Sequence, residues 1–247
     1  MISSKYFNPI QYEREIYQLA NKQNWKVTVY GEQSSFTLFF LSRESKISKK
    51  NLYISSGIHG DEPAGPLAIL ELFRESYDFG NLNVFIFPML SPAGLRANSR
   101  TDIHGVDLNR DYKFFKTNEV RVHVDILEKL PCFDGAICLH EDWEANGCYL
   151  YELNFDNKVN WGASILKEMS KYISIDLNET IDGRSAKEGV MQVIPNLEER
   201  HDWPEAFFLV KRKSKRVYTI ETPTTFELKD RVAAQKEAVK TIIKNFK

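Results

Sequence analysis

Three side chains that commonly bind zinc stand at the ends of short apolar segments. His59 and Glu62 follow the apolar residues 52–56 within Ser-Gly-Ile-His-Gly-Asp-Glu-Pro, and His140 follows the apolar residues 135–139. Two histidines and a glutamate form a ligand set that catalytic zinc sites use, with a fourth position left for water. Bound zinc would lower the pKa of that water and polarise a carbonyl group. The three residues therefore predict zinc-assisted hydrolysis, although solvated turns and strand ends also carry these residues without metal.

Hydrolysis also needs a group that accepts the proton of the attacking water. Glu221 follows the apolar residues 217–220, so its carboxylate would stand at a strand end like the predicted ligands. There it would take the proton from water and pass it to a leaving amine, which makes amide hydrolysis the predicted reaction class. The alternative interpretation is a surface carboxylate at the end of a strand.

The elements that must position these residues alternate along the chain. Short apolar segments typical of strands lie at residues 25–30, 35–41, 52–56, 83–87, 135–139 and 216–220. Segments with helical patterning lie at residues 10–22, 63–76, 118–130, 158–172 and 225–246. This alternation predicts a mixed, largely parallel sheet covered on both faces, with the strand ends meeting at one crevice. Residues 173–215, punctuated by glycine and proline, are expected to form a wall of that crevice.

Composition and charge limit the possible functions. The 247 residues show no repeat or low-complexity linker, which indicates a single domain over residues 1–247. A formal net charge of -1 argues against a general nucleic-acid binder. Three cysteines without a Cys-x-x-Cys pair indicate a reducing compartment and argue against zinc bound through sulfur. Residues 1–9 lack the pattern of a signal peptide and no segment is apolar enough to span a membrane, so we expect a cytoplasmic protein without a membrane partner.

Residues 105–110, Gly-Val-Asp-Leu-Asn-Arg, complete a pattern that resembles the zinc metallocarboxypeptidases. This family includes the pancreatic carboxypeptidases and the bacterial murein peptide amidases. The other matching elements are His59-x-x-Glu62, the strand-end His140 and the pair Glu221-Thr222, all in the family's order. The resemblance implies one three-layer α/β domain with an eight-stranded mixed, largely parallel sheet, and one Zn²⁺ per chain.

The resemblance also implies roles for residues that bind substrate. Arg100 stands at the family's position for the group that stabilises the oxyanion, with Arg96 as an alternative in the same loop. Asn109 and Arg110 match the pair that holds the terminal carboxylate of a substrate through charge-assisted hydrogen bonds. The implied partner is a peptide or peptide-like molecule with a free carboxylate. Three tyrosines are candidates for the family's mobile substrate-binding residue: Tyr149, Tyr151 and Tyr172.

An acidic stretch after His140 departs from the digestive carboxypeptidases. Glu141, Asp142 and Glu144 stand near the position where those enzymes have small or hydroxylic residues. The three carboxylates are interpreted as groups that orient a histidine ligand, as an acidic loop, or as a site for a cationic group of the substrate. A digestive type of side-chain preference is therefore not expected.

Two other functions compete with a carboxypeptidase or peptide amidase. An N-acyl amino acid deacylase of the aspartoacylase and succinylglutamate desuccinylase type shares His-x-x-Glu, Asp-Leu-Asn-Arg and the strand-end histidine. Gly-Val before Asp107 and the pair Glu221-Thr222 favour the peptidase. A non-catalytic domain that binds carboxylates is the third possibility, and the presence of all three ligands together with a base argues against it.

Overall fold

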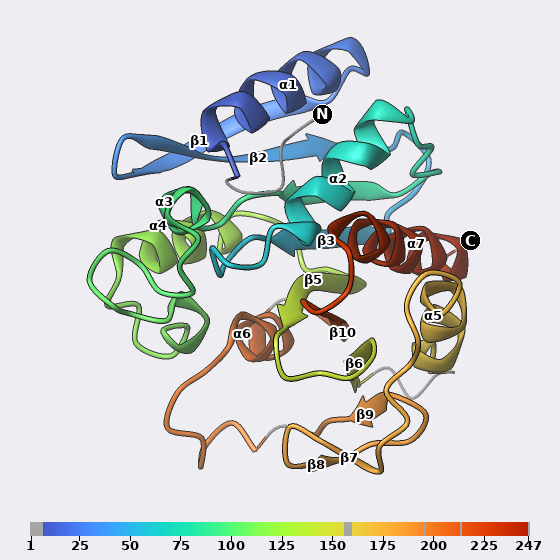
Figure 1. Cartoon of the computed structure of the whole chain (residues 1–247). Coiled ribbons are helices and arrows are strands. Elements are labelled where there is room, and N and C mark those ends of the chain that lie inside the picture. The colour runs from blue at the N-terminus through green and yellow to red at the C-terminus, as the bar shows by residue number, and fades with distance from the viewer. Residues whose placement is uncertain (1–6, 156–159, 195, 213, 247) are drawn as a thin grey trace.

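Eight strands form one mixed sheet in the order β1-β2-β4-β3-β5-β10-β6-β9 (Figure 1). The computed structural model describes residues 7–155, 160–194, 196–212 and 214–246. The strands are β1 Lys26–Gln33, β2 Phe36–Arg43, β3 Asn51–Ser56, β4 Asn83–Phe87, β5 Gly135–Asp142, β6 Tyr149–Asn154, β9 Val190–Gln192 and β10 Arg216–Pro223. The central strands β4, β3, β5 and β10 are parallel to one another. The predicted eight-stranded, largely parallel sheet is thus confirmed.

Helices cover both faces of the sheet, so that the protein has three layers (Figure 1). The helices are α1 Pro9–Lys22, α2 Ala64–Arg74, α3 Pro92–Ala97, α4 Asn118–Leu127, α5 Gly162–Met169, α6 Glu205–Arg212 and α7 Leu228–Asn245, with a 3₁₀ turn η1 at Leu108–Arg110. One apolar core joins the sheet to α1, α2, α5 and α7, and a second core joins it to α4 and α6. The result is a single α/β domain.

The central strand β3 shows why the apolar segments of this sequence are continuous. Leu52 and Ile54 belong to the core under α2 and α7, whereas Tyr53 belongs to the core under α4 and α6. All three side chains are fully buried. A strand that is covered on both faces needs apolar residues at successive positions, whereas a strand with one solvated face alternates. The apolar run therefore reflects the position of β3 in the middle of the sheet.

Strands β5 and β10 continue beyond the apolar residues that predict them. His140 lies within β5 and Glu221 within β10, each two residues before the end of its strand. The two residues are paired directly in the parallel register of β5 and β10. Strand β10 pairs with β5 on one side and with β6 on the other. These backbone hydrogen bonds keep the polar residues at the ends of β5 and β10 in the sheet. The sheet register thus places the predicted ligand beside the predicted base.

The segment 173–215 has more regular structure than its sequence indicates. It contains β9, α6 and a separate hairpin of β7 Thr180–Ile181 and β8 Arg184–Ser185. Figure 1 shows this hairpin below the ends of β6 and β9, apart from the helical layers. None of the described helices is long and apolar enough to cross a bilayer. The expectation about a signal peptide concerned residues 1–9, of which 1–6 lie outside the described residues.

Candidate metal centre and substrate pocket

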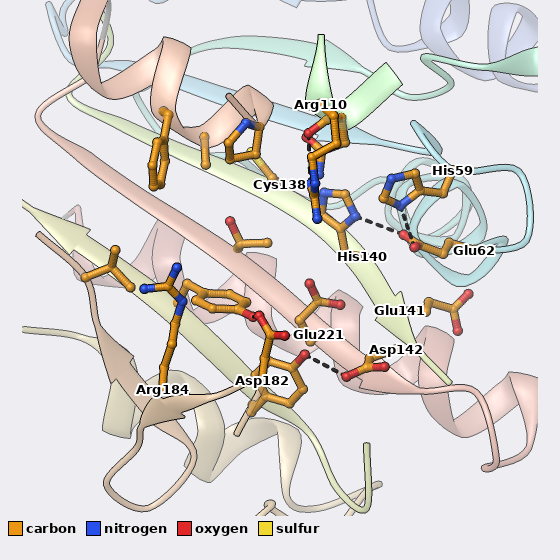
Figure 2. Close-up of a pocket in the computed structure, with 18 of the residues that line it drawn as sticks. His59, Glu62, Arg110, Cys138, His140, Glu141, Asp142, Asp182, Arg184 and Glu221 are labelled. Atoms are coloured by element: carbon orange, nitrogen blue, oxygen red, sulfur yellow. Dashed lines mark hydrogen bonds and ion pairs between the residues drawn. The ribbon is translucent and has the colours of Figure 1, made fainter. Parts of the chain in front are cut away.

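The three predicted zinc ligands converge. His59 and Glu62 lie in the turn between β3 and α2, and His140 lies on β5. Nδ1 of His59 is 2.6 Å from Oε1 of Glu62, and Nδ1 of His140 is 2.9 Å from Oε2 of the same carboxylate (Figure 2). One ligand atom from each residue lies within 4.8 Å of the others, and the side chains are 2–4% exposed. The structure therefore brings together the set that the spacing predicts.

The chemistry of this donor set fits a divalent metal. Burial lowers the pKa of His59, but the carboxylates of Glu62 and Asp107 outweigh this effect and raise it to about 9. Burial raises the pKa of Glu62, and His59 and His140 lower it below its usual range. A buried carboxylate with two histidine nitrogens turned toward it needs positive charge at that point. A zinc ion bound by His59, Glu62 and His140 would supply that charge and keep a position for water.

Two glycines allow the ligand turn to pack directly on the neighbouring loop. Gly57 has a φ of +63°, which L side chains rarely adopt. A Cβ at Gly60 would lie 1.9 Å from the carbonyl carbon of Gly94, so no other residue fits there. The backbone N–H of Gly60 donates to the carbonyl of Ser99 at 2.9 Å. The turn that carries His59 is thus fixed against the loop that carries Arg100.

A carboxylate that the sequence argument did not single out orients His59. Oδ1 of Asp107 is 3.0 Å from Nε2 of His59 and also accepts the backbone N–H of Asn109 at 2.9 Å. A histidine ligand is commonly held through its second nitrogen in this way, which leaves the first nitrogen for the metal. Asp107 lies inside the Gly-Val-Asp-Leu-Asn-Arg segment, and its place in that motif was the feature of the sequence that could have pointed to this role.

The structure distinguishes the two arginines of the loop after β4. Nη1 of Arg100 is 3.3 Å from Oε1 of Glu62, and Nη2 is 3.2 Å from Oδ2 of Asp107. Arg96 is exposed at the end of α3 and does not line the pocket. Arg100 is therefore the arginine that lies next to the candidate metal centre.

Glu221, Asn109 and Arg110 line the same pocket as the ligands. Burial raises the pKa of Glu221 well above its usual range, and the carboxylates of Glu62 and Asp142 raise it further. A bound cation would favour the ionised form that a base requires. Asn109 is buried, and Nη1 of Arg110 donates to its carbonyl oxygen at 2.9 Å. Figure 2 shows Arg110 and Glu221 on opposite sides of His140.

Comparisons with known proteins agree with this architecture. A family model described as the succinylglutamate desuccinylase/aspartoacylase catalytic domain matches residues 48–126. No curated protein sequence matches the chain. Similar solved structures include proposed metallopeptidases from Shewanella denitrificans OS217 (TM-score 0.84, 24% identity, 96% of this chain and 90% of that one) and Shewanella baltica OS155 (TM-score 0.84, 22% identity, 96% and 91%).

A metallo-carboxypeptidase from Pseudomonas aeruginosa, solved in complex with (2-guanidinoethylmercapto)succinic acid, is also similar. Its TM-score is 0.71 at 14% identity, over 98% of this chain and 69% of that one. The chain has the zinc carboxypeptidase-like fold. The resemblance that the sequence motifs carry is thus confirmed at the level of the fold.

In this carboxypeptidase-like domain two of the three acidic residues after His140, Glu141 and Asp142, have structural partners. Glu141 forms an ion pair with Arg231 and accepts the backbone N–H of Ala64 at the start of α2 at 2.7 Å. Asp142 accepts hydrogen bonds from the Tyr149 hydroxyl and from the backbone N–H of Glu144, both at 2.8 Å. None of these contacts involves a ligand histidine. The orienting carboxylate found at the centre is Asp107 instead.

The pocket of the carboxypeptidase-like domain has a volume of about 300 Å³. Residues from the segment 173–215 line it, as expected: Asp182, Arg184, Val193, Arg200, Ala206 and Phe207. Of the three candidate tyrosines, Tyr149 and Tyr151 line the pocket, whereas Tyr172 is 43% exposed after α5 and does not. The hydroxyl of Tyr151 donates to Oδ2 of Asp182 at 2.7 Å.

Proposed function

We propose that the protein is a zinc-dependent hydrolase that cleaves an amide bond next to a free carboxylate, as a carboxypeptidase or peptide amidase. The observation that carries this proposal is the convergence of His59, Glu62 and His140 in a pocket that also contains Glu221 and Arg110. A domain that only binds a carboxylate-bearing molecule has no physical need for three metal-binding residues together with a carboxylate base paired to one of them on the neighbouring strand.

Each residue of the pocket has its own role in the proposed hydrolysis. Zn²⁺, when bound, would supply Lewis-acid activation of the water and of the scissile carbonyl. Glu221 accepts the proton of the attacking water and delivers it to the leaving amine. Arg100 donates hydrogen bonds to the oxyanion that develops on the carbonyl oxygen. Asn109 and Arg110 hold the free carboxylate of the substrate, which places the neighbouring amide at the centre.

The test combines metal analysis with one substitution. Purified protein should contain about one zinc per chain, and a chelator should abolish hydrolysis of N-blocked dipeptides, because the water is then no longer activated. Glu221→Gln should lower kcat by at least about 100-fold, since general base catalysis is lost while the shape is kept. Glu32→Gln is the matched control, because Glu32 is exposed on β1 and lies outside the pocket. A zinc-free protein, or unchanged hydrolysis in Glu221→Gln, would refute the proposal.

The family match over residues 48–126 favours one second candidate, an N-acyl amino acid deacylase. That segment includes His59, Glu62, Arg100, Asn109 and Arg110, so both activities would use the same centre. They differ in the group on the far side of the scissile bond, which is a peptide in one case and a simple acyl group in the other. Rates on N-acetyl and N-succinyl amino acids, compared with rates on dipeptides of the same terminal residue, separate the two.

A further inference from the structure

Four arginines line the pocket, and three of them have an acidic partner. Arg100 contacts Glu62 and Asp107. Arg110 and Arg200 both approach Asp202, at 3.9 and 3.5 Å. The fourth is Arg184, and the described part of the chain places no carboxylate within ion-pair distance of it. Among the described residues, Arg184 is thus a pocket cation without a carboxylate partner, and it has no role in the steps above.

The position of Arg184 is set by a tight hairpin. The turn between β7 and β8 consists of Asp182 and Gly183, with φ values of +48° and +67°. Two successive positive φ values are typical of the two-residue turns that join twisted strands. Ile181 is buried against Tyr149 and Met191, which fixes the first strand of the hairpin.

A second contact ties the hairpin to the sheet. Oδ2 of Asp182 accepts the hydroxyl of Tyr151, a residue of β6, at 2.7 Å. Figure 2 shows Arg110 entering from above and Arg184 from the lower left, with Glu221 below Arg110. The guanidinium of Arg184 is therefore presented at the end of the pocket away from the predicted carboxylate clamp.

Three carboxylates of the pocket wall are already engaged by other groups. Asp182 and Asp142 each accept a tyrosine hydroxyl, and Glu141 is paired with Arg231. The lining also includes the neutral residues Cys138, Leu153, Val193 and Thr219, together with the exposed carboxylate of Glu144 and the predicted base Glu221. A planar guanidinium that lines a pocket and has no carboxylate partner among the described residues favours a carboxylate ligand, because it donates two parallel hydrogen bonds.

We propose that Arg184 binds the side-chain carboxylate of the residue whose α-carboxylate Arg110 holds, so that the protein prefers substrates ending in glutamate or aspartate. This inference rests on the proposed function, because it takes that clamp as given. It differs from the cationic substrate group that Glu141, Asp142 and Glu144 suggest in the sequence. Glu141 and Asp142 have partners and Glu144 is exposed, whereas Arg184 has no carboxylate partner among the described residues, so the structure favours an anionic group.

The test measures binding of free amino acids to the zinc-loaded protein by calorimetry, which does not require turnover. L-Glutamate should bind at least about tenfold more tightly than L-glutamine, because only the former pairs with Arg184. Arg184→Gln should remove this difference, and Arg184→Lys should restore part of it. Arg96→Gln is the matched control, since Arg96 is an exposed arginine outside the pocket. Circular dichroism checks that the variants are folded.

Other outcomes overturn the proposal. These are equal binding of glutamate and glutamine by the wild-type protein, no binding of either, tightest binding of L-lysine, or a glutamate preference that persists in Arg184→Gln. Hydrolysis of dipeptides ending in the same residues is measured in parallel. Selective glutamate binding without hydrolysis of any substrate refutes the proposed function and leaves the Arg184 site standing. Hydrolysis without a preference for glutamate refutes the Arg184 site alone.

Discussion

Asp107 acts on the candidate metal centre through a histidine. Because it holds Nε2 of His59, the other nitrogen of that ring faces Glu62 and the predicted metal position. Burial raises the pKa of Asp107, but hydrogen bonding to His59 and the charges of His59 and Arg100 outweigh this and lower it to about 2. The group is therefore ionised at neutral pH and increases the basicity of the histidine ligand.

Replacing this carboxylate by an amide tests its role. Asp107→Asn keeps the size of the side chain but removes the charge that strengthens His59 as a ligand. We expect zinc affinity to fall by about 10- to 100-fold, measured by competition with a chelating dye. Asp125→Asn, on the exposed side of α4, should leave the affinity unchanged. Equal affinities in the two variants would show that Asp107 has no part in holding the metal.

Individual residues differ in how far the sequence reveals them. His59, Glu62 and His140 follow apolar strands, and this local pattern was sufficient to predict that they meet. Arg184 has no such signal, because a lone arginine beside Asp-Gly is typical of any exposed turn. Only the fold shows that it faces Arg110 across a pocket (Figure 2).

At the scale of elements, the long central strands and helices were predictable and the short ones were not. Apolar runs identified β3, β4, β5 and β10, because strands covered on both faces need them. The hairpin β7–β8 has strands of two residues each, which is too short for any periodicity. The polar ends of β5 and β10 stay in the sheet through pairing with other strands, and single-sequence patterns do not contain that information.

Helix α4 packs a histidine against the sheet, and this contact predicts how stability depends on pH. The ring of His123 lies between the hydroxyls of Tyr53 and Tyr112, at 3.1 and 2.7 Å, and burial lowers its pKa to about 3. The unfolded chain has a histidine pKa of about 6.5 and so binds more protons than the folded protein between these values. Acidification through this range therefore favours unfolding.

From pH 7 to pH 5, this one residue should reduce the free energy of unfolding by about 2 kcal/mol. His123→Gln keeps hydrogen-bonding groups but does not titrate, so it should lose that part of the pH dependence. Urea unfolding of both proteins at both pH values, with chelator present throughout, provides the measurement. The same pH dependence in both proteins would mean that His123 does not remain neutral in the folded state.

At the scale of the whole molecule, the candidate metal centre joins separate parts of the chain. His59 and Glu62 come from the turn before α2, and His140 comes from a strand about 80 residues later. A ligand that binds only the folded state stabilises it by mass action, by about 4 kcal/mol at 1,000 times its dissociation constant. Zinc should therefore contribute to global stability as well as to chemistry.

Removal of the metal tests this contribution. For a protein of this size, about 4 kcal/mol corresponds to a decrease in Tm of roughly 10 °C when the metal is removed by a chelator. Calorimetric scans with zinc and with chelator measure the difference. His140→Ala should show almost no response to chelator, because it lacks a ligand. A wild-type Tm that does not respond to zinc would contradict the predicted site.

The close contact between Gly60 and Gly94 bears on how such a protein can diversify. A side chain at Gly60 would displace the ligand turn and the loop before Arg100 together, so that the predicted metal ligands and Arg100 would move in one step. Arg184 lies on an exposed hairpin that is held in place by contacts of two other residues, Ile181 and Asp182. Under the proposed function, a substitution at position 184 should therefore change the preferred terminal residue without moving the predicted metal ligands, whereas a side chain at position 60 would displace them.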